Sequence, residues 1–248
     1  MDMDKVKKLQ EFIDESNRIV FFGGAGVSTE SGIPDFRSVD GLYNQKYDYP
    51  PEQILSHTFF MNKTKEFYRF YYDKIMITGI EPNAAHNKLA ELEKAGKLDA
   101  VVTQNIDGLH QKAGSKTVYE LHGSVARNSC MQCGAHYDLD YVMDPANCDG
   151  LVPKCKSCGG IVKPDVVLYE EALDDDQING AVSALGAADV LIIGGTSLVV
   201  YPAAGFIRFF RGSKMVLINK SSTSYDNNAD LVIHDAIGKV LKEAVDGI

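Results

Sequence analysis

Hydrophobic positions along the chain fall into two kinds of segment. Short runs rich in apolar residues occur at 18–22, 98–103, 118–121, 189–194, 214–219 and 230–234, and each has the length of a buried strand. Between them, the segments 4–16, 83–96, 174–188, 201–211 and 235–245 are expected to be helical, and in the first of them Val6, Leu9, Phe12 and Ile13 share one face. The alternation predicts an α/β fold with a doubly wound parallel sheet.

Three segments interrupt this alternation. Residues 23–50 are rich in Gly, Ser, Asp and Pro, so we expect a long loop there, and long loops within compact domains are often functional. Residues 51–78 are crowded with Phe and Tyr and predict a small helical insert with an aromatic core. Residues 124–168 contain every cysteine of the chain and form a third region of different character.

Composition and charge narrow the class of protein. The 248 residues suffice for one large domain with insertions or for two modest domains, and 45% hydrophobic with 24% charged residues is ordinary for a folded chain. The first residues lack the pattern of a signal peptide, and no apolar run approaches the roughly 20 residues that span a bilayer. We therefore expect a cytoplasmic protein without a membrane partner. The net charge of -9 disfavours non-specific nucleic-acid binding.

The cysteines predict a metal site. An odd number of cysteines in a chain of this kind favours metal binding over a disulfide framework. Cys130 and Cys133 form one CxxC pair, and Cys155 and Cys158 form another. Four thiolates suit one structural Zn²⁺ per chain, because no position stays open for water. The alternative is four reduced free thiols; Cys148 lacks a CxxC partner and is expected to be a free thiol. A zinc ribbon that binds nucleic acid is disfavoured, since acidic residues outnumber basic ones in this segment.

Two glycine-rich turns follow predicted strands. One is the segment 24–29 (GAGVST) and the other is the segment 194–197 (GGTS). Glycines let the backbone approach a pyrophosphate, and Asn219 and Asp235 end further strands that would meet the same edge of the sheet. Thr29 stands where a dinucleotide fingerprint has its third glycine, so an ordinary tight turn remains open and a hydride-transferring dehydrogenase is disfavoured.

Polar residues gather in three further segments: 32–37 (GIPDFR), 103–110 (TQNIDGLH) and 120–123 (ELHG). A lone His122 would more often be an interior histidine than a catalytic one. Together with GAGVS, the two CxxC pairs, GTS and the strand-final Asn219, these segments make the chain resemble the sirtuin family over residues of about 20 to 235.

The resemblance implies an NAD-dependent protein-lysine deacetylase, which transfers the acetyl group from lysine to ADP-ribose and releases nicotinamide and O-acetyl-ADP-ribose. It implies a Rossmann-like domain of residues 1–38, 80–123 and 169–248, with a small domain made of a helical module (39–79) and a zinc-binding module (124–168). His122 would be the general base. By the same resemblance, the residues that contact NAD would be Ala25, Thr29, Phe36, Arg37, Gln104, Asn105, Ile106, Asp107, His122, Thr196, Ser197, Asn219, Asp235 and Ala236.

The segment 163–171 resembles the family's substrate-binding strand, in which Val166 and Val167 would lie beside the acyl-lysine. The family usually has Gly where this chain has Glu170, and we expect Glu170 and Glu171 to favour basic residues in the substrate. Sirtuins that remove acidic acyl groups carry a Tyr-x-x-Arg pair, whereas this chain has Tyr71 and Lys74, which favours acetyl over succinyl.

We expect acetylated proteins or peptides as partners, no direct nucleic-acid contact, and a monomer. Two other functions share the same NAD site: mono-ADP-ribosyl transfer, and non-catalytic sensing of NAD or ADP-ribose. His122 and the substrate strand favour the deacetylase over both.

Overall fold

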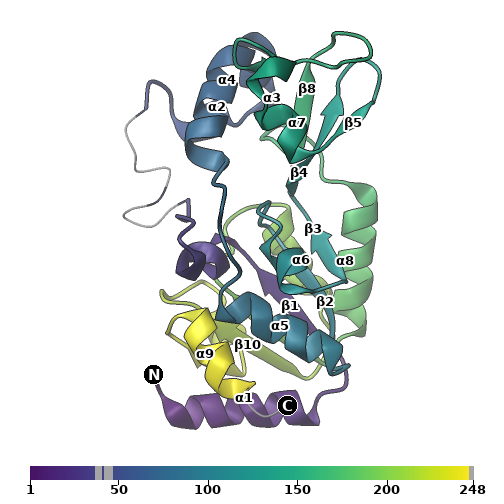
Figure 1. Cartoon of the computed structure of the whole chain (residues 1–248). Helices are drawn as coiled ribbons and strands as arrows, with labels where there is room; N and C mark the ends of the chain where they lie inside the picture. Colours follow the sequence, from purple (N-terminus) through teal and green to yellow (C-terminus); the bar gives the residue numbers. More distant parts are fainter. Residues whose placement is uncertain (37–40, 42–46, 246–248) are drawn as a thin grey trace.

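A parallel sheet forms the centre of the protein. The computed structural model describes residues 1–36, 41 and 47–245. Within them a six-stranded sheet has the order β11-β10-β9-β1-β2-β3, and all neighbours run parallel (Figure 1). The predicted doubly wound, Rossmann-like sheet is confirmed. Its strands are β1 (Ile19–Gly23), β2 (Leu98–Thr103), β3 (Val118–Glu120), β9 (Val190–Gly194), β10 (Lys214–Ile218) and β11 (Leu231–Ile233).

Helices cover both faces of this sheet because side chains alternate along each strand. In β1, Ile19 and Phe21 enter the core formed with α1 (Met3–Glu15), α5 (Ala84–Lys94) and α9 (Ile237–Ala244). Val20 and Phe22 enter the opposite core, formed with α8 (Asp175–Ala187) and the 3₁₀ helix η5 (Ala203–Phe209). A strand that is buried on both faces needs apolar residues at successive positions. This is why apolar runs in the sequence predicted the strands of the sheet.

A second part of the molecule lies beyond the carboxyl ends of the strands, at the top of Figure 1. Strand β4 (Gly123–Cys130) pairs antiparallel with β5 (His136–Tyr137) and β8 (Val162–Val166). Around them lie α7 (Leu139–Met143), η4 (Pro145–Asn147) and the pair β6 (Cys148–Asp149) and β7 (Val152–Pro153).

The predicted aromatic insert consists of α2 (Pro51–Ile54), α3 (His57–Asn62), α4 (Thr64–Phe70) and the π-helical η3 (Tyr71–Ile75). Its Phe and Tyr rings form one buried cluster, in which Phe60 and Phe67 meet edge to face with ring centroids 4.8 Å apart. Leu168 packs into the same cluster, so the segment after β8 lies against the insert.

Gly123 joins the two parts. It follows His122, opens β4 and pairs with Val166 of β8. Its φ is +75°, and a Cβ there would lie 1.9 Å from the carbonyl oxygen of Asp165. No other residue fits this position, because both the backbone conformation and the approach of β8 exclude a side chain.

The sequence-based elements differ from the structure in three places. The segment 23–50 was expected to be a loop, but residues Ala25–Ser31 form the 3₁₀ helix η1, while 37–40 and 42–46 lie outside the described residues. The helix expected at 201–211 is also 3₁₀ and shorter. The short helix α6 (Leu109–Ala113) escaped prediction because five residues are too few to show helical spacing; Gly108 and Gly114, both with positive φ, bound it. No helix among the described residues has the length and apolar character to cross a membrane.

Candidate active site and metal centre

Two glycine turns touch at the carboxyl ends of β1 and β9. Gly23 and Gly194 are partners in the sheet, and the N–H of Gly26 donates to the carbonyl oxygen of Gly195 over 2.8 Å. A Cβ on Gly26 would lie 2.8 Å from the Cα of Gly195, and a Cβ on Gly195 would lie 2.4 Å from the nitrogen of Val27. Side chains are therefore excluded from this contact. A pyrophosphate can approach a backbone closely only where such side chains are absent.

The 3₁₀ helix η1 continues the first turn and carries two of the predicted NAD residues. Ala25 and Thr29 are half-buried, and the hydroxyl of Thr29 donates to the carbonyl oxygen of Gly26 over 2.9 Å. Phe36 is also half-buried, while Arg37 lies outside the described residues.

A polar network follows β2 and centres on Ser28. The Ser28 hydroxyl donates to Oδ2 of Asp107 over 2.7 Å and accepts from Nδ2 of Asn105 over 3.1 Å. Oδ1 of Asp107 accepts from the N–H of Leu109, so the carboxylate is held at both oxygens. Ser28 was not among the predicted site residues, although it lies in the GAGVS motif that pointed to the site.

Gln104 connects this network to the second glycine turn. Its Nε2 donates to the hydroxyl of Thr196 over 3.1 Å, and its backbone N–H donates to the carbonyl oxygen of Gly23 over 3.0 Å. Ile106 accepts the N–H of Val125 at its carbonyl oxygen. Hydrogen bonds thus join Gln104 to Thr196, and they join Asn105 and Asp107 through Ser28. The two groups adjoin because Gln104 and Asn105 are consecutive in the chain.

His122 is held at one ring nitrogen. Its Nδ1 lies 3.0 Å from the carbonyl oxygen of Gln104, and because a carbonyl only accepts, Nδ1 carries the proton. No hydrogen bond engages Nε2 within the described part of the chain, so its lone pair is available. Burial lowers the pKa of His122 below 6.5, against the opposing effect of the Gln104 carbonyl. At neutral pH the ring is therefore a neutral base.

Two buried histidines lie under the network, and neither was predicted. The rings of His86 and His110 meet with centroids 4.7 Å apart. Nδ1 of His86 accepts the N–H of Asn83, which leaves Nε2–H facing the Ser28 hydroxyl at 3.5 Å. Both ring nitrogens of His110 lack a hydrogen-bond partner among the described residues. Burial lowers the pKa of His86 to about 4, and burial together with His86 lowers that of His110 to about 3.

The remaining predicted NAD residues lie at the ends of β9, β10 and β11. Ser197 is exposed and Asn219 half-buried, with Nδ2 of Asn219 donating to the carbonyl oxygen of Ser221. Asp235 accepts the N–H of Ala236 over 2.8 Å and pairs with the amino group of Met1 at 3.3 Å. The Ala236 N–H holds the pKa of Asp235 below its usual value. These residues share the sheet edge with the network but make no direct hydrogen bond to it among the described contacts.

The predicted substrate strand is adjacent to His122. The N–H of Val167 donates to the carbonyl oxygen of His122 over 3.0 Å. Val166 is buried and Val167 half-buried.

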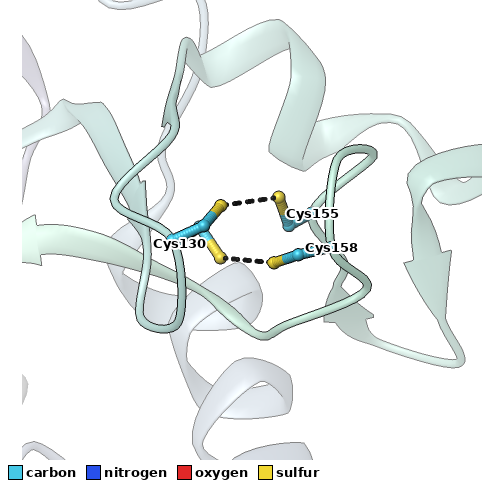
Figure 2. A group of neighbouring side chains, drawn as sticks. Cys130, Cys155 and Cys158 are labelled. Atoms are coloured by element: carbon cyan, nitrogen blue, oxygen red, sulfur yellow. Dashed lines mark hydrogen bonds between the residues drawn. The ribbon is translucent and has the colours of Figure 1, made fainter.

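The four paired cysteines converge from two turns of the same design (Figure 2). In each, a glycine directly after the second cysteine has a positive φ, +71° for Gly134 and +74° for Gly159, and its N–H donates to the carbonyl oxygen of the first cysteine. This geometry turns both sulfurs of a pair toward one point.

The sulfur positions fit a tetrahedral zinc. All four Sγ atoms lie within 4.8 Å of one another, with 3.4 Å between Cys130 and Cys158 and 3.5 Å between Cys133 and Cys155. Zinc–sulfur bonds of about 2.3 Å place tetrahedral sulfurs about 3.8 Å apart. The cluster therefore fits a structural Zn²⁺. Cys148 does not belong to it, and its Sγ lies 3.6 Å from the carbonyl oxygen of Asp144.

Comparisons with known proteins agree on one family. The model of the Sir2 family matches residues 24–202. The NAD-dependent protein deacetylases of Clostridium acetobutylicum and Clostridium perfringens are 62% and 61% identical, each over 98% of this chain and 99% of the relative. A structure described as the basis for the mechanism and regulation of Sir2 enzymes is 40% identical with a TM-score of 0.89, covering 99% of this chain and 98% of that one. A complex of Sir2 with p53 peptide and NAD⁺ is 37% identical with a TM-score of 0.84, covering 98% and 96%.

The buried histidine pair predicts acid lability. In the unfolded chain both histidines bind a proton near pH 6.5, whereas in the folded protein they stay neutral down to about pH 4 for His86 and about pH 3 for His110. The free energy of unfolding is therefore highest above pH 6.5 and decreases as the pH falls toward 4. Urea titrations at pH 7.5 and 5.0 are expected to differ by on the order of 2 kcal/mol per histidine in the free energy of unfolding. His110→Phe, which loses no hydrogen bond in the described chain, should remove about half of this difference. His136→Gln, which removes an exposed histidine, should leave it unchanged, and equal loss in both variants would contradict the assignment.

The cysteine cluster predicts one bound zinc per chain. Metal analysis of the purified protein should give one equivalent, and Cys158→Ser should lose the metal and lower the thermal midpoint, because a structural zinc site contributes directly to folding. Cys148→Ser is the matched control and should retain both. Loss of zinc from the Cys148 variant would show that Cys148 is one of the zinc ligands.

Proposed function

The chain belongs to the Sir2 family, and from this membership we propose how its residues carry out the reaction. The protein is an NAD-dependent protein deacetylase. We propose that the acetyl group passes from lysine to ADP-ribose, with nicotinamide, free lysine and O-acetyl-ADP-ribose as products. The neutral His122 with an available Nε2 is the observation that carries this proposal.

His122 acts as the general base. Its Nδ1–H is committed to the carbonyl oxygen of Gln104, which fixes the tautomer and the ring orientation. Nε2 then accepts the proton of a ribose hydroxyl, so that the hydroxyl oxygen can attack the acyl carbon. The lowered pKa keeps this nitrogen unprotonated at neutral pH, at the cost of a somewhat weaker base.

The polar edge of the sheet would hold NAD, whose bond between ribose and nicotinamide supplies the electrophile when the cofactor is bound. The two glycine turns would take the pyrophosphate, and Asn219, Asp235 and Ala236 would lie toward the other end of the cofactor. Asp107 would accept from the nicotinamide amide, and its two hydrogen bonds fix its carboxylate for that role. Phe36 and Ile106 would enclose the nicotinamide together with Asp107, and Arg37 would be a further contact to NAD.

The acyl-lysine would lie along Val166 and Val167. The hydrogen bond from the Val167 N–H to the His122 carbonyl oxygen places this strand and the base in direct contact. Two solved Sir2 structures contain p53 peptides, which supports a peptide substrate for this chain.

Acetyl remains the favoured acyl group. Tyr71 is buried in the aromatic cluster and stacks on Phe67 with centroids 5.5 Å apart, while Lys74 pairs with Asp73 at 3.1 Å. A lysine already paired with its neighbour is a poor partner for an acidic acyl chain, and it lacks the planar fork of arginine.

The domain boundaries, the monomeric state and the absence of a nucleic-acid partner stay predictions.

Mono-ADP-ribosyl transfer is the second function to test. Mass spectrometry of an acetyl-lysine peptide with and without NAD distinguishes the two: loss of acetyl matched by nicotinamide supports deacetylation, and gain of ADP-ribose on a protein supports transfer.

His122→Ala should lower turnover of the acetyl peptide by about 100-fold or more, because general-base catalysis is lost. NAD affinity, measured by calorimetry, should change by no more than about twofold, since the ring contributes no charge at neutral pH. His136→Ala provides the control for removal of a histidine. Unchanged turnover in His122→Ala would remove this residue from its role.

The pH dependence offers an independent check on the base. Since protonation inactivates His122 and burial lowers its pKa, the acid limb of kcat/KM should lie below pH 6.5, with full activity at neutral pH. An acid limb centred above pH 7 would contradict a desolvated histidine as the base.

A further inference from the structure

A tight turn ends the proposed substrate strand in an unusual backbone conformation. The N–H of Glu171 donates to the carbonyl oxygen of Leu168 over 3.0 Å, which makes Glu170 the third residue of the turn. Its φ is +76°, and Leu198 is the one other non-glycine residue with positive φ in the described chain. Turns of this kind favour Gly or Asn at the third position. A glutamate there is strained, so its side chain must make contacts that compensate.

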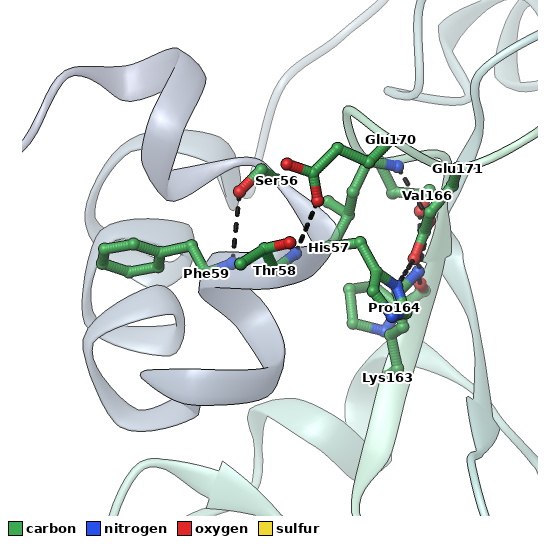
Figure 3. Close-up of polar contacts among 10 residues, drawn as sticks. Ser56, His57, Thr58, Phe59, Lys163, Pro164, Val166, Glu170 and Glu171 are labelled. Carbon is green, nitrogen blue, oxygen red and sulfur yellow. Dashed lines mark hydrogen bonds and ion pairs between the residues drawn. The ribbon is translucent and has the colours of Figure 1, made fainter.

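The compensating contact is a cap on helix α3 (Figure 3). The first residues of a helix have N–H groups without partners inside the helix. The N–H of His57 donates to the carbonyl oxygen of Tyr169 over 2.9 Å, and that of Thr58 donates to the carboxylate of Glu170 over 2.8 Å. The N–H of Phe59 donates to the N-cap residue Ser56 over 3.2 Å. The turn therefore supplies two of these three acceptors.

Glu171 connects the same turn to β8 through an ion pair with Lys163. Its Oε1 lies 2.9 Å from Nδ1 of His57, and its Oε2 lies 3.0 Å from Nζ of Lys163 and accepts the N–H of Leu168 over 2.9 Å. Nζ of Lys163 also donates to the carbonyl oxygen of Val166 over 2.9 Å. Both carboxylates thus have hydrogen-bond partners within the protein, and their preference for basic residues in the substrate stays a prediction.

The strand is now fixed at both ends. At one end the N–H of Val167 is bonded to the carbonyl oxygen of His122. At the other end the N–H of Tyr169 donates to the carbonyl oxygen of Leu55, and Glu170 caps α3. Val166 and Val167, the residues proposed to lie beside the acyl-lysine, adjoin the first of these contacts, and Leu168 joins them to the second. The held turn therefore limits how far this segment can move relative to His122.

We propose that Glu170 is a positioning residue for substrate binding: its carboxylate locks the turn to α3 and so sets the place of the substrate strand relative to His122. The inference rests on the proposed function, since it assigns a role to the strand that receives the acyl-lysine. Glu170 acts through the backbone of this strand and need not touch the substrate.

Three substitutions separate the cap from the strained backbone. Glu170→Gln keeps an acceptor oxygen, Glu170→Ala keeps the strain and loses the cap, and Glu170→Gly loses both. The expected result for Ala and Gly is a KM for an acetyl-lysine peptide raised by about fivefold to tenfold, the size of one lost solvent-exposed hydrogen bond, while kcat and the KM for NAD change by no more than about twofold. Glu170→Gln should retain most of the wild-type peptide KM.

The thermal midpoint of unfolding distinguishes a role of Glu170 in substrate positioning from a role in stability alone. Glu170→Ala should lower it, and Glu170→Gly should recover most of that loss because glycine accepts a positive φ. The peptide KM should stay high in Glu170→Gly nevertheless. A wild-type KM in Glu170→Gly would overturn the proposal and leave Glu170 as a tolerated replacement for glycine.

Two controls complete the test. Glu66→Ala removes an exposed glutamate from the neighbouring helix α4 and should leave the peptide KM unchanged. Hydrogen exchange at the Thr58 amide should accelerate in Glu170→Ala, and unaltered protection would show that the cap does not form. Absence of turnover in the unchanged protein would count against the proposed function, whereas turnover with equal peptide KM in all variants counts against the role of Glu170 alone.

Discussion

The backbone contact between Gly26 and Gly195 is the constraint on which the rest of the site depends. It brings the turns after β1 and β9 together without intervening side chains, so that Thr196 comes within reach of Gln104. The carbonyl oxygen of Gln104 in turn fixes the tautomer of His122. Gln104 therefore links the second glycine turn, through its side chain, to the proposed base His122, through its backbone carbonyl.

The sequence predicted those parts of the fold whose neighbours are apolar on every side. Strand β2 (Leu98–Thr103) was placed at its observed bounds because a short apolar run, Ala100 to Val102, lies between the helix stop at Gly96 and the polar residues that follow Thr103. The 3₁₀ helix η1 was missed, since it is held by contacts to the second glycine turn rather than by an apolar stripe of its own. His86 was missed because its place on the buried face of α5 marks it as core, and its contact with Ser28 is made only in the folded chain.

The cysteine cluster was predictable for a different reason. Two CxxC pairs define a ligand set by local spacing alone, and Gly134 and Gly159 already stand in the sequence where each turn needs a positive φ. The contact of Glu170 with α3 could not be predicted from the sequence, because the two segments meet only in the folded chain. The carboxylate of Glu170 suggested a charge offered to the substrate, and the sequence gives no sign that it also accepts the N–H of Thr58 in α3.

Gly123 directly follows His122 and is the first residue of β4, the strand that ends at Cys130, and a Cβ there would fall 1.9 Å from a backbone oxygen. This position admits one residue type, so a change there disrupts β4 and β8 together rather than adjusting them. Adaptation of such an enzyme to new substrates must then proceed through positions other than Gly123, where a side chain can change without moving two strands. The residue next to the proposed base is thereby closed to gradual change, although it carries no side chain for chemistry.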